Sequence, residues 1–210
     1  MIPTLKSCIQ VRPALHHDAI QALINGQILA FRIPGFVTKE ACHQWKGQIS
    51  SAPWSRYSNA ADVPVLRIGM TLFETENRPE KLSTYFEAAP TTHPQIEAIF
   101  QGENPLKMLH EKLDESWEDG CNVATCSDRM MNPGILRAFE AHAKGGLPPH
   151  VDSLRKDLPN HSSIQKVRTQ LAANLYISTG QGGGELEIWD FMPNAPTLQS
   201  LFEGNHDFLD

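Results

Sequence analysis

The amino-terminal half of the chain carries apolar residues at the spacing of amphipathic helices. The first stripe lies in residues 16–26 and ends in Asn25-Gly26, a pair typical of a helix C-cap. A second helix is predicted from Thr38, whose hydroxyl suits an N-cap, to about Ile49. Further helices are predicted in residues 78–89, 92–101 and 104–117. Short apolar runs predict a buried strand in residues 27–33 and a strand in residues 65–73.

After Gly120 the pattern changes to alternation of apolar and other residues with period two. Such alternation indicates strands, because successive side chains of a strand point to opposite faces of its sheet. Turns rich in glycine, proline and asparagine separate the segments. The predicted strands lie within residues 121–127, 134–144, 167–179 and 184–191. We therefore predict one mainly β (α+β) domain over residues 1–210, in which a helix-rich support of residues 1–120 braces a strand-rich portion of residues 121–210.

Composition fits a globular protein with one well-buried core. The chain has 210 residues, of which 40% are hydrophobic and 20% charged. A net charge of -6 gives no reason to expect nucleic acid as a partner. The longest apolar runs are far below the roughly 20 residues that cross a bilayer, so we expect no membrane partner and a cytoplasmic location. The four widely spaced cysteines are interpreted as reduced thiols.

A histidine and an aspartate follow the glycine- and proline-rich turn in "GGLPPHVDSLRKD", residues 145–157. His150 and Asp152 are two residues apart, so in an extended segment both side chains lie on the same face and can hold one ion between them. Pro148-Pro149 would stiffen the approach to the pair. The alternative is an ordinary surface turn that carries charge.

Three segments resemble a known enzyme family. They are "GQILAFRIPGFVTKEACHQW", "LRAFEAHAKGGLPPHVDS" and "LAANLYISTGQGGGELEIWDF". They are similar to the double-stranded β-helix (jelly-roll) dioxygenases that use non-haem Fe(II) and 2-oxoglutarate, over roughly residues 26–50 and 134–191. The resemblance implies that His150 and Asp152 are two ligands of a two-histidine, one-carboxylate iron site, which leaves coordination positions open for other molecules.

Three further residues are candidates for binding 2-oxoglutarate. Arg137 precedes the ligand pair on a predicted strand and could hold a carboxylate bidentately; an exposed arginine on a strand is the alternative. Asn174 and Tyr176 share a face of the next strand, at positions that the resemblance associates with the 2-oxoglutarate carboxylates. The alternative for Tyr176 is a core tyrosine with a satisfied hydroxyl.

The third iron ligand is not assigned. Family members place a distal histidine several strands later, followed by an arginine or similar residue. His206 is the histidine that follows the glycine-rich hairpin, but it lies in a polar stretch without a strand pattern. We expect the 210 residues to be an incomplete part of a longer chain, so that the last strands of the jelly roll are missing from them. The third ligand is then either His206 or a residue beyond Asp210.

The resemblance implies an enzyme that couples oxidative decarboxylation of 2-oxoglutarate, with dioxygen, to hydroxylation of an unactivated C–H bond. Asp152 favours hydroxylation over halogenation, because halogenating members have a small residue at that position. By analogy we expect a small carboxylate-bearing substrate, such as a free or N-substituted amino acid. Two other classes remain open: a non-catalytic, cupin-like barrel that binds a metal or ligand, and an interaction domain in which "HVD" is a turn.

Overall fold

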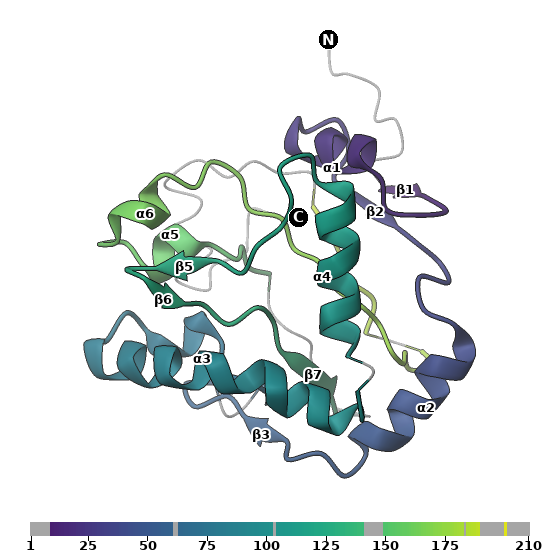
Figure 1. Ribbon diagram of the computed structural model, residues 1–210, viewed down its shortest axis with the longest axis horizontal. Coiled ribbons are helices and arrows are strands. Elements are labelled where there is room, and N and C mark those ends of the chain that lie inside the picture. The colour runs from purple at the N-terminus through teal and green to yellow at the C-terminus, as the bar shows by residue number, and fades with distance from the viewer. Residues whose placement is uncertain are drawn as a thin grey trace.

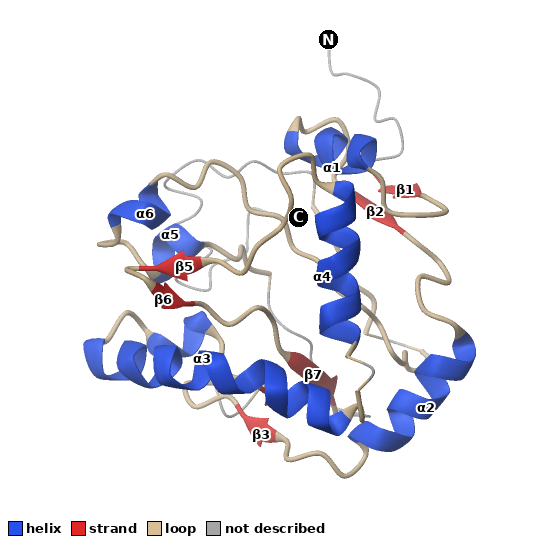
Figure 2. Cartoon of the chain, in the orientation of Figure 1, coloured by secondary structure: helices blue, strands red, loops and turns tan. Residues whose placement is uncertain are grey.

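The computed structural model describes residues 9–60, 63–102, 104–140, 149–182, 184–189 and 200. The long helix α3 (Pro79–Ile99) and the helix α4 (Pro105–Ser116) run in different directions, and α4 lies near the middle of the view in Figure 1. Short strands lie between and beside the helices, and much of the carboxy-terminal portion is loop (Figure 2). No helix in these described ranges is both long enough and apolar enough to span a bilayer.

The first predicted helix and strand are confirmed. Helix α1 (His17–Ile24) ends at Asn25, and Gly26 takes the positive φ of 65° that makes glycine favourable after a helix. Strand β2 (Ala30–Arg32) then pairs in parallel with β1 (Ile9–Val11). The residues of β2 are half-buried or exposed, so the expectation of a buried strand is wrong here.

Side-chain caps start two of the predicted helices where expected. Helix α2 (Lys39–Ile49) begins after Thr38, whose Oγ1 accepts a hydrogen bond from the backbone N–H of Ala41 at 3.2 Å. Asn104 caps α4 in the same way by accepting from the backbone of Leu106 and Lys107. These contacts satisfy backbone donors that have no partner within the helix.

The prediction of separate helices in residues 78–89 and 92–101 is wrong, because α3 runs through both. Pro90 and Pro94 lie inside it, although proline removes a helical hydrogen bond and crowds the preceding turn. Burial along one side of the whole helix offsets this local cost. The buried residues of α3 are Leu82, Tyr85, Phe86, Ala89, Thr92 and Ile96.

A three-stranded antiparallel sheet lies beside α3, with the order β3 (Ser55–Arg56), β4 (Val65–Ile68) and β7 (Leu136–Phe139). The strand predicted over residues 65–73 stops at Ile68. Gly69 has a φ of 94°, which is outside the extended region, and the chain then forms the 3-10 helix η1 (Leu72–Thr75). The Glu74 side chain closes this turn by accepting from the backbone N–H of Thr71 at 2.9 Å.

Gly69 also lets β4 approach α3 closely. A Cβ atom at this position would lie 2.8 Å from side-chain methyl carbons of both Ile135 and Thr92. We expect Gly69→Ala to lower the free energy of unfolding by roughly 2 kcal/mol or more, because it combines overpacking with a positive φ. Chemical denaturation measures this change.

The matched control is Gly47→Ala, in the exposed part of α2. A Cβ there would meet no atom within 4 Å, so alanine should stabilise the helix slightly. Equal midpoints of denaturation for Gly69→Ala and the unaltered protein would contradict the close approach.

The strand predictions of the carboxy-terminal half are met only in part. Strands β5 (Thr125–Cys126) and β6 (Arg129–Met130) form a small hairpin, and β7 occupies four residues of the segment predicted over 134–144, whose residues 141–144 lie outside the described ones. Residues 167–179, and 184–189 of the last predicted strand, pair with no strand in the described chain. Residues 190 and 191 lie outside the described part. A β-strand is defined by its hydrogen bonds to a neighbouring strand, and these segments form none in the described chain. The jelly roll therefore stays a prediction.

Two short helices complete the described elements, α5 (Leu154–Asp157) and α6 (Ser162–Gln165). The core consists of two hydrophobic clusters, and α3 contributes to both. The first contains Leu72, Leu82, Tyr85, Phe86, Cys126, Met131, Leu158 and Ile164. The second contains Trp45, Ile68, Ile96 and Phe100. Cys42, Cys121 and Cys126 are free thiols, as expected, and Cys8 lies outside the described residues.

Candidate metal centre and its surroundings

His150 and Asp152 lie close together, as the sequence predicts. The Nε2 atom of His150 is 4.0 Å from Oδ1 of Asp152, and the two side chains are 50% and 64% exposed. Both therefore face accessible space rather than the core. A nitrogen and a carboxylate oxygen form a donor pair that suits a divalent transition metal.

The segment that follows Asp152 is anchored to three parts of the molecule. Ser153 caps α5 with its side chain, and the backbone N–H of Leu154 donates to Oε1 of Gln170 at 3.0 Å. The Arg155 side chain donates to the carbonyl oxygen of Val167. Helix α5 packs against η1, and Leu158, directly after α5, is fully buried in the first core cluster. The ligand pair is thus fixed from its carboxy-terminal side.

The spacing of the pair fits one ion. Nitrogen and oxygen ligands lie about 2.1 Å from a small divalent ion, so two of them can be at most about 4.2 Å apart. The observed 4.0 Å satisfies that bound. Ligands at right angles would be about 3 Å apart. Rotation of two half-exposed side chains is enough to make that change, and the residues present therefore fit a metal ion.

The third ligand is not found among the described residues. In these ranges no group of three or more histidine, cysteine, aspartate and glutamate side chains is arranged to hold a metal. His206, the candidate from the sequence, lies outside the described part of the chain. Its assignment stays a prediction.

Arg137 lies on β7, directly opposite Arg67 of β4. It is exposed, as the alternative interpretation expects. Burial raises the pKa of Tyr57, while the nearby positive charge of Arg137 opposes that rise. Tyr57 therefore keeps its proton at neutral pH.

Asn174 and Tyr176 lie in a segment without regular secondary structure and are both exposed. Tyr176 is 58% exposed, so the interpretation of it as a core tyrosine is wrong. Leu175 and Ile177, between and after them, pack on the cluster around Trp45. The two predicted residues therefore share a face directed away from that core, but no hydrogen bond joins either of them to Arg137 in the described structure.

Sequence reasoning missed a buried ion pair beside Arg137. The Glu74 carboxylate is fully buried and pairs with Arg67, whose side chain is 14% exposed. Glu74 also accepts from the backbone N–H of Ser58 at 3.2 Å and from Thr71. The available signal was an arginine within the apolar strand "VLRI", since an ion inside an apolar element calls for a partner.

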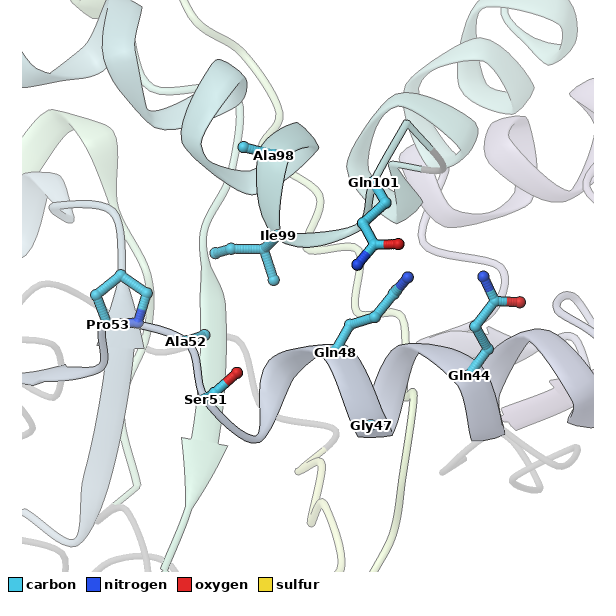
Figure 3. A pocket seen from close by; sticks show the side chains of 9 residues that line it. All are labelled: Gln44, Gly47, Gln48, Ser51, Ala52, Pro53, Ala98, Ile99 and Gln101. Atoms are coloured by element: carbon cyan, nitrogen blue, oxygen red, sulfur yellow. The ribbon is translucent and has the colours of Figure 1, made fainter.

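A groove of about 550 Å³ lies elsewhere, between the carboxyl ends of α2 and α3 (Figure 3). Amide side chains dominate it, and Gln48 and Gln101 point toward one another across it. None of the candidate metal or 2-oxoglutarate residues lines it. The groove is therefore not part of the candidate centre.

Comparison with protein families gives one match. The model of the family described as "Carrier-protein-independent halogenase WelO5" matches residues 9–206, which is nearly the whole chain. No curated protein and no solved structure matches the chain. The matched range includes the "HVD" segment and Arg137, so the candidate centre lies within the part of the chain that the family model matches. This chain belongs to the family of the carrier-protein-independent halogenase WelO5, an enzyme family of the Fe(II)/2-oxoglutarate-dependent oxygenase class.

Proposed function

We propose that this protein hydroxylates an unactivated C–H bond of a small, carboxylate-bearing molecule, with Fe(II) and 2-oxoglutarate as cofactors and dioxygen as oxidant. The observation that carries the proposal is the pair of His150 and Asp152, whose donor atoms lie within the span of one ion. The description of the family as carrier-protein-independent supports a free substrate, such as a free or N-substituted amino acid.

The chain's own residues would bind and orient the reactants. His150 would bind the metal through a neutral imidazole nitrogen and Asp152 through one carboxylate oxygen. Arg137, exposed on β7, would hold a carboxylate of 2-oxoglutarate, and the exposed face of Asn174 and Tyr176 is proposed to line the same space. When bound, iron would activate dioxygen, the oxidant, while 2-oxoglutarate would donate two electrons through its decarboxylation to succinate, and this chemistry would cleave the C–H bond.

Asp152 is the reason to propose hydroxylation in a family named after a halogenase. A halide that binds the metal needs a coordination position, and a small residue in place of the aspartate leaves one free. Here a carboxylate oxygen lies 4.0 Å from the histidine nitrogen and would occupy that position. Halogenation is the second candidate, and the name of the matched family favours it.

The test is an anaerobic titration with Fe(II) and 2-oxoglutarate, followed by addition of air. We expect the weak visible charge-transfer band of a chelated oxo-acid, and then succinate formation that candidate amino acids stimulate. With chloride and bromide present, mass spectrometry should find a product heavier by one oxygen atom. A halogenated product would instead support the second candidate.

Absence of both the band and succinate formation would contradict the oxygenase. Metal binding without consumption of 2-oxoglutarate would point to the non-catalytic barrel. A longer form of the chain is titrated in parallel, because a third ligand beyond Asp210 would make the band appear in that form alone.

A further inference from the structure

The backbone directly after the metal pair is held by residues from a later part of the chain. The backbone N–H of Leu154, two residues after Asp152, donates to Oε1 of Gln170 at 3.0 Å. The Arg155 side chain donates to the carbonyl oxygen of Val167. Two contacts therefore join the start of α5 to the segment that follows α6.

The segment that carries Gln170 is itself anchored on both sides. Before it, the backbone N–H of Val167 donates at 3.0 Å to the carbonyl oxygen of Ile164, a residue buried in the first core cluster. After it, Leu175 packs on the second core cluster. Gln170 lies between these two points, so its side chain joins Leu154 to a supported stretch of chain.

Gln170 also satisfies a donor that has no partner within its own helix. The first backbone N–H groups of a helix find no acceptor inside it, and α5 begins at Leu154. The Ser153 hydroxyl accepts from another N–H of this first turn, that of Lys156, at 3.4 Å. A helix of four residues is too short to be stable by itself, so these contacts maintain its start.

The N–H of Leu154 is the backbone donor that the Asp152 side chain reaches most easily. Aspartate side chains commonly accept a hydrogen bond from the N–H two residues further along the chain, which forms an Asx-turn. A carboxylate held in such a turn is directed at its own backbone. Because Gln170 accepts from this N–H, the Asp152 carboxylate faces His150 instead, with Oδ1 4.0 Å from Nε2.

We infer that Gln170 is a positioning residue, which keeps the Asp152 carboxylate available to the metal by occupying the backbone N–H of Leu154. The inference rests on the proposed function. Gln170 acts through Leu154 and is not itself a metal ligand. Loss of its side-chain carbonyl should free the N–H of Leu154, which then competes with the metal for the carboxylate.

The test is anaerobic Fe(II) titration of variants at Gln170. For Gln170→Ala we expect the Kd for Fe(II) to rise about 3- to 10-fold, the effect of one competing hydrogen bond. Gln170→Glu keeps an acceptor oxygen on a side chain of the same length, so its Kd should stay within about twofold of that of the unaltered protein.

A second substitution removes the donor instead of the acceptor. Proline has no N–H and is favoured at the first position of a helix, which Leu154 occupies in α5. Ser153 has the extended φ of -144° that suits a residue before proline. Gln170→Ala combined with Leu154→Pro should therefore bind Fe(II) within about twofold of the unaltered protein. Leu154 packs against the first core cluster, so a purely structural role of Gln170 predicts a larger loss in this double variant.

The matched control is Gln165→Ala, which also removes an exposed glutamine bonded to the backbone. Nε2 of Gln165 donates to the carbonyl oxygen of Pro159 at 3.1 Å, away from the N–H that follows Asp152. This variant should leave the Kd for Fe(II) unchanged. The melting temperature of every variant, followed by circular dichroism, shows whether the fold is retained.

Three results overturn the inference. If the unaltered protein binds Fe(II) and Gln170→Ala binds it equally well, or if Leu154→Pro in a folded double variant fails to restore the affinity, then Gln170 does not protect Asp152 and the proposed function is untouched. Where the double variant does not fold, Gln170→Glu decides, and a Kd as high as that of Gln170→Ala overturns the inference. If the unaltered protein does not bind Fe(II), the proposed function and the inference fall together.

Discussion

His150→Ala is expected to abolish Fe(II)-dependent turnover. Loss of an outer partner of a metal ligand typically costs 10- to 100-fold in affinity or activity, so loss of a ligand itself should cost at least about a hundredfold. The fold should survive, because the His150 side chain is 50% exposed and surface changes usually alter stability by about 0.5 kcal/mol or less. Succinate formation and anaerobic Fe(II) titration measure the loss, and circular dichroism checks the fold.

Asp152→Ala should give the same result, because the proposed function makes both residues ligands of one ion and their donor atoms lie 4.0 Å apart. The matched control is His43→Ala, which removes an exposed histidine of α2 and should change neither iron binding nor turnover. Full iron affinity and turnover in both site variants would identify "HVD" as a charged turn. A loss confined to His150→Ala would leave the histidine as a ligand and remove the argument for hydroxylation that rests on the Asp152 carboxylate.

Local signals in the sequence locate α1, α2 and α4, but they wrongly divide α3, where burial outweighs the prolines, and they did not predict α5 or α6. Thr38 and Asn25-Gly26 mark helix ends through their own hydrogen bonds and backbone angles. Pro90 should have ended a helix, but the buried side of α3 continues on both sides of it. No nearby residue reveals that burial, since the partners of α3 lie far away in the sequence.

The strands depend on partners that are distant in sequence. In residues 134–144, alternation correctly indicates β7, which finds β4 across a long separation. The same alternation over residues 167–179 forms no ladder in the described chain, although exposed and half-buried residues still alternate at Tyr176 and its neighbours. The two-residue alternation shows which face of a strand is apolar, but it does not show which other strand pairs with it.

The closeness of His150 and Asp152 was predictable because both residues lie in one short stretch of the chain, and their role as metal ligands stays a prediction. The surroundings of Arg137 were not predictable, because Arg67 lies opposite it only through the register of the sheet, and Glu74 reaches Arg67 only through the turn of η1. A charged residue within an apolar strand, such as Arg67 in "VLRI", is the sequence signal of a buried ion pair. It signals that a partner exists and does not say which residue the partner is.

The Glu74–Arg67 pair provides the second large expected effect. Glu74→Ala should lower the free energy of unfolding by about 3–5 kcal/mol, because it leaves the charge of Arg67 buried and uncompensated. It also removes the acceptor of the Ser58 and Thr71 backbone N–H groups. Urea denaturation followed by circular dichroism measures the change.

Glu140→Ala is the matched control, since it also breaks one glutamate–arginine pair of the same sheet. Arg56 and Glu140 are 46% and 36% exposed, so their pair should contribute less than about 1 kcal/mol. The double variant Glu74→Leu with Arg67→Met should recover much of the stability lost in Glu74→Ala, because it removes the unpaired charge. If Glu74→Ala costs no more than Glu140→Ala, solvent reaches Arg67 and the pair does not act as a buried one.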